Sequence, residues 1–200
     1  FSVGWAQTVP PCTLEITDAE TFARDWTVID VNSDVSANTW AYNDGNAMYM
    51  QDKSNAADDW LIAPAVTLEA GKAYKVSAYV KHSSTFGSDK QKIELKIGTA
   101  PTVEGLTTRL VYDESFQSRL FVEKSGTFSP AESGVFYVGL RCYSESYNGD
   151  LYFQKIVIEE APVYPAQITD LSIVAGERGA MSATLSWTWP CLLYTSPSPR

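Results

Sequence analysis

Three oxygen-bearing side chains stand on alternate residues near the start of the chain, at Asp30, Asn32 and Asp34. A curled loop with this spacing can aim all three side chains at one hard cation such as Ca²⁺. Calcium takes about six to eight oxygens, so backbone carbonyls and more distant carboxylates must contribute. The candidates for the additional ligands are Asp58, Asp59, Glu15 and Asp18. The alternative is an Asx-rich turn that satisfies its own backbone, and the residues alone leave both interpretations open.

Aromatic side chains form a second group that could do chemistry, because sugar rings stack on aromatic faces through their C–H groups. We predict a ligand-binding platform formed by Trp40, Tyr42, Tyr49, Tyr143 and Tyr147, with Tyr79 as a further candidate. The alternative is that these rings pack in the core or at its rim, as large rings usually do. The prediction therefore concerns the group and not any single ring.

Catalytic chemistry finds little support in the sequence. His82 is the single histidine, so any Ser-His-Asp or Cys-His arrangement must include it, and no nucleophile elbow accompanies it. Catalytic zinc would need further His or clustered Cys ligands. No pair of carboxylates stands out for glycoside hydrolysis. We predict no catalytic residues and expect His82 at a strand end, in contact with solvent.

Two cysteines, Cys12 and Cys142, remain once Cys191 is assigned to a foreign tail, as described below. In a secreted protein they could form a disulfide between an early and a late strand. Cys142 alternates with Leu140 and Val138, so a buried free thiol is the rival interpretation. The sequence does not decide between them.

Alternation with a period of two dominates the middle of the chain. Tyr74, Val76, Ala78 and Val80 should face a core, and Ile93, Leu95 and Ile97 repeat the pattern. Turn signals separate the strands, among them Asn43-Asp44-Gly45 and Glu69-Ala70-Gly71-Lys72. Thr17 and Glu20 predict one capped helical turn. About ten short strands with hardly any helical period predict an all-β sandwich.

Composition excludes two classes of partner. The formal net charge is −9 and the pI about 4.6, whereas nucleic-acid binding needs a basic stripe. No apolar run approaches the roughly 18 residues needed to span a membrane. The composition suits an extracellular protein that captures divalent cations.

The stretch DDWLIAPAVTLEAGKAYKVSAYV (residues 58–80) resembles the central motif of cleaved-adhesin, or choice-of-anchor J, domains. Looser matches are TDAETFARDWTVIDVNSDVSANTWAY (residues 17–42) and LYFQKIVIEE (residues 151–160). The resemblance implies a non-catalytic jelly-roll β-sandwich attached to other domains in a secreted bacterial surface protein. It also implies structural calcium in some members, held by a loop of the form Asp-x-Asn/Asp-x-Asp-Gly. Here Val35 stands where Gly is common, and Gln154 and Lys155 stand where an acidic pair is common.

The predicted domain organisation has five parts. Residues 1–9 resemble a signal-peptide remnant or a disordered start, residues 10–160 form the jelly-roll domain, and residues 161–167 form a linker. Residues 168–190 resemble the truncated start of a fibronectin type III domain. Residues 191–200 resemble a translated sequencing adapter and are excluded as an artefactual tail.

The function predicted on these grounds is a non-catalytic adhesion or substrate-targeting module at the cell surface, binding a glycan or a host or matrix protein. The predicted cofactor is structural calcium, and other domains of the same polypeptide are expected. The alternatives are a domain of a secreted calcium-containing hydrolase and a structural spacer without a ligand.

Overall fold

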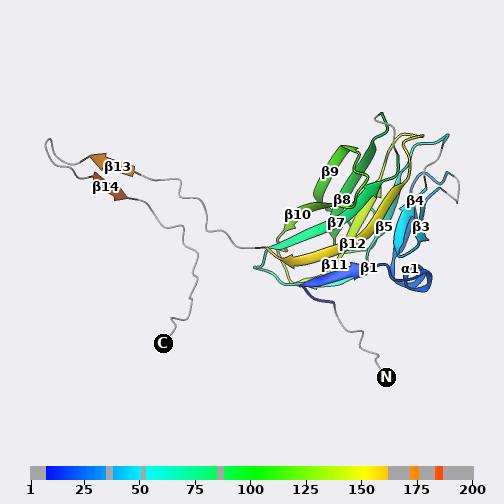
Figure 1. Cartoon of the computed structure of the whole chain (residues 1–200). Coiled ribbons are helices and arrows are strands. Elements are labelled where there is room, and N and C mark those ends of the chain that lie inside the picture. Colours follow the sequence, from blue (N-terminus) through cyan, green and yellow to red (C-terminus); the bar gives the residue numbers. More distant parts are fainter. Residues whose placement is uncertain are drawn as a thin grey trace, which may run out of the picture. The chain divides into compact units, whose positions relative to one another are not determined.

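The computed structural model describes residues 8–34, 38–50, 53–84, 88–161, 172–175 and 183–186. The chain divides into two compact units, Phe1–Ala161 and Pro162–Arg200, which are described separately (Figure 1). The first unit contains a single α-helix in its described part and is otherwise built of strands.

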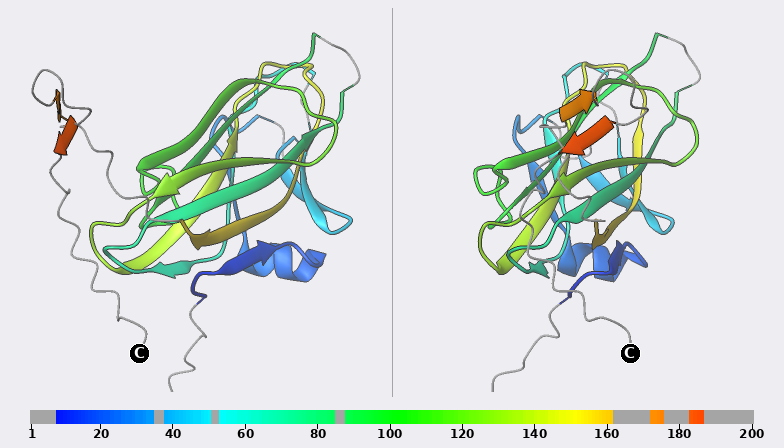
Figure 2. Two further views of the ribbon diagram at one scale, coloured as in Figure 1. Left: turned by 60° about the vertical axis from the view of Figure 1, so that its left-hand side comes forward. Right: turned by 90° about the vertical axis from the view of Figure 1, so that its left-hand side faces the viewer.

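Two antiparallel sheets make up the first unit. The first sheet has the order β10-β7-β12-β4-β3, with β1 paired to β12. Its strands are β1 (Cys12–Glu15), β3 (Trp40–Asn43), β4 (Asn46–Tyr49), β7 (Tyr74–His82), β10 (Val122–Phe128) and β12 (Leu151–Glu160). The second sheet has the order β2-β5-β11-β8-β9, with β6 paired to β11. Its strands are β2 (Thr27–Asp30), β5 (Asp59–Ile62), β6 (Val66–Leu68), β8 (Gln91–Gly98), β9 (Thr108–Phe116) and β11 (Gly134–Cys142). Figure 2 shows β7 and β12 running side by side through the first layer.

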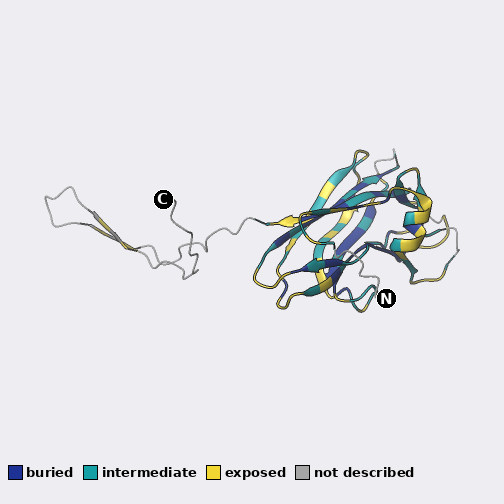
Figure 3. Ribbon diagram, turned by 90° about the horizontal axis from the view of Figure 1, so that it is seen from below, coloured by how far each residue is buried: buried dark blue, intermediate teal, exposed yellow. Residues whose placement is uncertain are grey.

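The core lies between the two sheets and is built from alternate residues of each strand. On β7 the buried hydrophobic residues are Tyr74, Val76, Ala78 and Val80, and on β8 they are Ile93, Leu95 and Ile97, as the alternation predicts. Fully burying an aliphatic or aromatic side chain of this kind contributes about 1.5–3 kcal/mol. Figure 3 shows dark blue, buried segments along the strands of the sandwich. The all-β sandwich prediction is confirmed.

The short connections follow the turn chemistry of the sequence. Strands β3 and β4 form a hairpin in which Asp44 and Gly45 have φ angles of 45° and 74°, as a type I′ turn requires. Gly71 has a φ of 80° in the turn that precedes β7. Both predicted turns are therefore confirmed.

Helix α1 (Ala19–Asp25) begins one residue later than predicted. Asp18, not Thr17, is the N-cap: its carboxylate accepts hydrogen bonds from the Thr21 backbone N–H at 2.7 Å and from the Thr17 hydroxyl at 2.9 Å. These hydrogen bonds lower the Asp18 pKa to about 2. Asp18 caps the helix because its carboxylate accepts from the backbone N–H of Thr21 in the first turn.

The second unit contains a two-stranded antiparallel ribbon, β13 (Ser172–Ala175) and β14 (Ala183–Ser186). The fibronectin type III-like assignment of residues 168–190 stays a prediction. The predicted signal remnant, except for Thr8 and Val9, and the adapter tail lie outside the described residues. Among the described residues, no helix is long and apolar enough to cross a membrane.

Candidate functional site

Two loops, one between β2 and β3 and the other between β4 and β5, line an open hollow of about 530 Å³ at one end of the sandwich. Hydrogen bonds hold the loops together: the Val31 N–H donates to the Asp58 carbonyl at 2.9 Å, and the Ala57 N–H donates to the Ser144 carbonyl at 2.8 Å. The residues that line this acidic hollow are Asn32, Asp34, Asn55, Ala56, Ala57 and Asp58. The fold thus brings Asn32 and Asp34 next to Asp58, across 24 residues of sequence or more.

A buried carboxylate without a full set of partners lies behind the acidic hollow. Asp59 is the Cα partner of Asp30 on the neighbouring strand and is 0% exposed. Its Oδ1 atom has no hydrogen-bond partner. Burial, followed by the charges of Asp30 and Asp34, raises the Asp59 pKa to about 7, although the nearby Thr39 side chain and the Asp58 backbone N–H oppose the shift. Like charges on directly opposite residues of a sheet destabilise it, so this pair favours a bound proton or a cation.

The other predicted calcium ligands have partners within the protein. The Asp30 carboxylate accepts from the Ser33 N–H at 2.7 Å, and the Asn32 amide donates to Asp34 at 3.1 Å and to the Ala56 carbonyl at 2.7 Å. Asp58 forms a bidentate pair with Arg141, at 2.7 and 2.8 Å.

The two distant candidates serve other purposes, since Glu15 lies 3.9 Å from Lys155 and Asp18 caps α1. In the described part of the chain, no three His, Cys, Asp or Glu side chains are arranged to hold a metal ion. The Asx-turn interpretation therefore describes Asp30, whereas the Oδ1 atom of Asp59 still lacks a hydrogen-bond partner.

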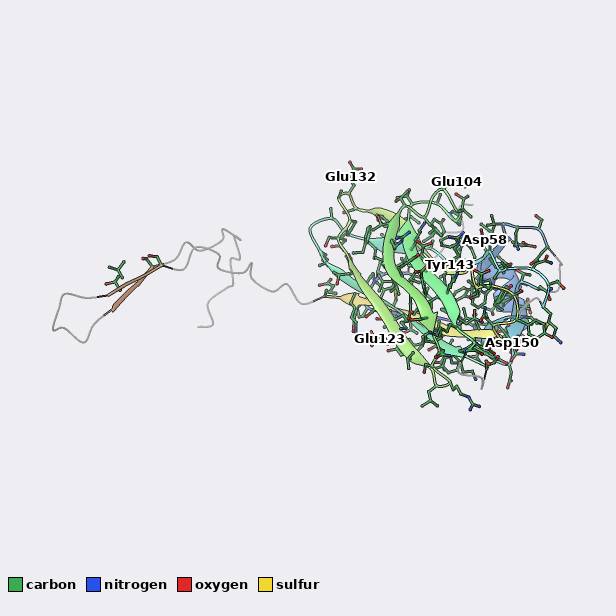
Figure 4. The ribbon with its side chains drawn as sticks, turned by 90° about the horizontal axis from the view of Figure 1, so that it is seen from above. Asp58, Glu104, Glu123, Glu132, Tyr143 and Asp150 are labelled. Carbon is green, nitrogen blue, oxygen red and sulfur yellow. The ribbon has the colours of Figure 1, made fainter. Side chains whose placement is uncertain are left out.

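Beside the acidic hollow, the outer face of the second sheet carries a stacked pair of tyrosines. The rings of Tyr112 and Tyr143 lie 6.1 Å apart at an interplanar angle of 23°. Arg109 lies 4.7 Å from the Tyr112 ring centroid and Arg141 lies 5.1 Å from that of Tyr143. Asp58 and Tyr143, labelled in Figure 4, are joined through Arg141, so this Tyr112–Tyr143 face adjoins the acidic hollow.

A buried carboxylate fixes the two arginines of this face. The Glu94 side chain is only 2% exposed and lies 2.6 Å from Arg109 and 3.5 Å from Arg141. Beneath the face, the Tyr143 hydroxyl and the Trp60 indole nitrogen are buried without hydrogen-bond partners. Burial, followed by the nearby Tyr112 hydroxyl, raises the Tyr143 pKa.

The predicted aromatic platform is only partly exposed. Trp40 and Tyr49 are Cα partners on β3 and β4, are each 2% exposed and pack edge to face at 6.0 Å. The prediction that these two rings are exposed is wrong, because both occupy the inward positions of their strands. Tyr42 accepts a hydrogen bond from the Gly45 N–H within the hairpin. Tyr147, by contrast, is 63% exposed.

His82 ends β7 as predicted but is only 2% exposed, so the expected contact with solvent is wrong. Its Nε2 atom hydrogen-bonds to the Asn148 carbonyl, which also accepts from the Gln91 amide at 3.1 Å. The nearby Ser84 hydroxyl donates to Asp89 and not to the imidazole. The histidine thus ties the 144–150 loop to the sheet.

Both cysteines in the first unit are free, so the disulfide alternative is wrong. Cys142 is fully buried and its thiol donates to Gln91 at 3.3 Å. Burial raises the Cys142 pKa to about 12. The buried-thiol interpretation is the one that the structure supports.

Sequence reasoning missed four residues of this face, namely Glu94, Arg109, Tyr112 and Arg141. A weak signal exists, because Glu94 alternates with inward Ile93 and Leu95, and Arg141 alternates with inward Leu140 and Cys142. Both therefore had to point outward. Their meeting depends on the β11–β8 register, which pairs Arg141 with Glu94.

The two packed antiparallel sheets define a jelly-roll β-sandwich. No protein-family model and no curated protein matches the sequence. Among solved structures, the chain is similar to the K1 cleaved adhesin domain of Lys-gingipain from Porphyromonas gingivalis W83, with 14% identity and a TM-score of 0.52. That match covers 76% of this chain and 99% of the K1 domain.

Two further cleaved adhesin domains of Lys-gingipain are similar. The K2 domain has 15% identity and a TM-score of 0.52, over 76% of this chain and 100% of that domain. The K3 domain from P. gingivalis W83 has 12% identity and a TM-score of 0.50, over 72% of this chain and 92% of that domain. At these identities the similarity shows the fold alone.

Proposed function

We propose that residues 10–160 form a non-catalytic binding module that takes a glycan on the Tyr112–Tyr143 face. The observation that carries this proposal is the stacked tyrosine pair, of which Tyr112 is 51% exposed, set between two arginines. Aromatic rings give a sugar an apolar surface, and guanidinium groups beside them donate to its hydroxyl groups. A rigid sheet already holds these rings and donors in place, so little conformational entropy is lost when a ligand binds.

The charged groups of the face support binding more than catalysis. Arg141 is shared between Asp58 and Glu94, and Glu94 is also paired with Arg109. Both carboxylates are therefore occupied by arginines within the protein and are poorly placed to reach a substrate. His82, the other candidate for proton transfer, is buried against a backbone carbonyl. The hydrolase alternative would need a catalytic pair elsewhere.

A glycan array, followed by titration calorimetry with the best neutral glycan, tests the proposal. We expect Tyr143→Ala and Tyr112→Ala each to weaken binding by about tenfold, as the loss of one aromatic contact implies. Tyr147→Ala shows whether the exposed loop ring extends the platform. Tyr79→Ala on the opposite sheet is the matched control and should leave the affinity unchanged. Binding that survives the Tyr112→Ala, Tyr143→Ala double variant would contradict the proposal, and no binding at all would favour the spacer.

We further propose that the module belongs to a secreted surface protein and serves adhesion or substrate targeting beside other domains, with residues 168–190 as the start of a fibronectin type III-like domain. The low content of charged residues and the fold of the adhesin neighbours support this context. Fractionation of the producing cells, with an antibody against residues 10–160, should recover the protein at the surface or in the medium. Recovery from the cytoplasm alone would contradict this proposal.

We also propose a structural Ca²⁺ in contact with Asp59. The specific observation is the orphaned, fully buried Asp59 Oδ1 atom opposite Asp30. The oxygens of Asp30, Asn32, Asp34 and Asp59 would hold the ion, and the ion would neutralise their mutual repulsion. Calorimetric titration with CaCl₂ should show one saturable site that Asp59→Asn abolishes. Asp89→Asn, outside the acidic hollow, is the control, and equal binding by all three proteins would contradict the proposal.

A further inference from the structure

The outer face of the first sheet carries a lysine between two aromatic rings. The Lys81 ammonium lies 4.5 Å from the Tyr152 ring centroid and 4.9 Å from that of Phe121. Lys81 and Tyr152 are Cα partners on β7 and β12, and Phe121 directly precedes β10, the strand on the other side of β7. All three side chains are partly exposed. The sheet thus presents one positive charge flanked by two aromatic rings.

The charge of Lys81 is not neutralised by an acid, unlike that of its neighbours on the same face. Lys75 pairs with Glu123 at 2.5 Å, and Lys155 lies 3.9 Å from Glu15. Within the described residues, the Lys81 ammonium makes no ion pair and instead contacts the two aromatic rings. Ring faces attract a cation but leave the three ammonium donors able to bind an anion.

We propose that Lys81, Phe121 and Tyr152 bind a sugar that carries a carboxylate, of the uronic acid class. The carboxylate lies on the Lys81 ammonium, and the C–H groups of the sugar ring lie against Phe121 and Tyr152. This site is on the opposite sheet from the Tyr112–Tyr143 face, so it stands whether or not that face binds a neutral glycan.

The position of the site on the sheet favours a uronate over an acidic peptide. The site lies over β7, whose backbone is paired on both sides with β10 and β12. A peptide therefore has no free strand edge to join at this position, whereas a sugar needs only the rings and the charge.

Titration calorimetry of the full chain with hexagalacturonic acid, and with its methyl ester, tests the proposal. We expect the acid to bind and the ester to bind at least about fivefold more weakly, because esterification removes the charge that meets Lys81. Lys81→Met keeps the aliphatic stem and should abolish the preference for the acid. Tyr152→Leu should weaken the acid and the ester together.

Lys96→Met is the matched control, because Lys96 also lies over a ring, that of Trp60, but on the second sheet. It should bind hexagalacturonic acid as the wild type does, and thermal melts verify that each variant is folded. Failure of the wild type to bind the acid, or an unchanged preference in Lys81→Met, overturns the proposal. Equal binding of a hexaglutamate peptide overturns the assignment to a sugar. The Tyr112→Ala, Tyr143→Ala double variant should retain uronate binding, so a failure of one site is distinguishable from a failure of the other.

Discussion

The Asp59 carboxylate couples the stability of the sandwich to pH. Its folded-state pKa of about 7 lies above the ordinary value of 3.8, mainly because the side chain is buried. Between these two values the folded protein holds a proton that the unfolded chain has released, so the free energy of unfolding falls as pH rises from about 4 to 7. Above pH 7 Asp59 is ionised in both the folded and the unfolded protein, and the loss in the free energy of unfolding is complete.

We predict that calcium-free wild-type protein is less stable at pH 8 than at pH 5, and that Asp59→Asn removes most of this difference. A pKa change from 3.8 to about 7 corresponds to roughly 4 kcal/mol over the whole range, of which at most about 3 kcal/mol falls between pH 5 and pH 8. Urea unfolding at the two pH values, for both proteins in chelator, measures the effect. An equal pH dependence in wild type and Asp59→Asn would show that other groups cause it. Added CaCl₂ should restore the wild type at pH 8.

At the same scale, the sequence predicted residue types better than residue surroundings. Asp30, Asn32 and Asp34 were identified as a polar loop, and the structure places Asn32 and Asp34 on one hollow with Asp58. Trp40 and Tyr49 were misassigned because a ring beside a polar loop looks the same in sequence whether it faces in or out. The sequence names Asp59 among the candidate calcium ligands, but its complete burial and its pairing with Asp30 arise from the fold and could not be predicted.

Among the elements, the loop between β8 and β9 stabilises the outer face of the second sheet. Leu106 from this loop packs with Trp60 and Ile62 of β5 in a cluster separate from the main core. The loop lies so close to the end of β8 that a Cβ atom on Gly98 would be 1.8 Å from the Gly105 carbonyl oxygen. Only a residue without a side chain fits there.

We therefore predict that Gly98→Ala destabilises the protein by roughly 1–3 kcal/mol, the usual cost of an overpacked site. It should also increase the exposure of Trp60, because the loop that carries Leu106 must move away. Thermal unfolding and the tryptophan fluorescence maximum report the two effects. In Gly134→Ala, the added Cβ has its nearest neighbour at 4.0 Å, so this control should change stability by no more than about 0.5 kcal/mol. Equal stability of the two variants would contradict the prediction.

Element types were largely readable from sequence, whereas their pairing was not. The alternation over Tyr74–Val80 and the Asn43–Gly45 turn depend on neighbours in the chain, and both predictions are confirmed. The pairing of β11 with β5 joins residues that are 77–83 positions apart, and its pairing with β8 joins residues that are 39–49 positions apart. A register of this kind follows from side-chain packing across the sandwich. A shift by one residue would move every side chain of the strand to the opposite face of the sheet.

For the molecule as a whole, both end segments of the first unit are bonded to the rest of that unit. The Ala161 N–H donates to the Ala73 carbonyl at 2.8 Å, and Lys72 pairs with Glu160 at 2.6 Å. At the other terminus, β1 pairs with β12 from Cys12 to Glu15. The structural boundary at residue 161 agrees with the change to a Pro-rich sequence.

We predict that a shortened chain of residues 8–161 unfolds in one cooperative transition, with a midpoint close to that of the first unit in the full chain. Its affinity for the neutral glycan should equal that of the full chain, because the Tyr112–Tyr143 face belongs wholly to the first unit. Differential scanning calorimetry and titration calorimetry check the two statements. A large loss of either would show that residues beyond 161 contribute to the fold or to the face.

The antiparallel pairing of β1 with β12 also has a geometric consequence for display on a longer polypeptide. Because Cys12 lies opposite Ile158, the chain enters and leaves this sandwich at the same pole. The acidic hollow belongs to the other pole, where β12 begins at Leu151, about 30 Å away at the usual rise per strand residue. Segments joined at both termini would therefore attach the module at one pole. The pole with the acidic hollow would then face away from the attachment and toward a ligand.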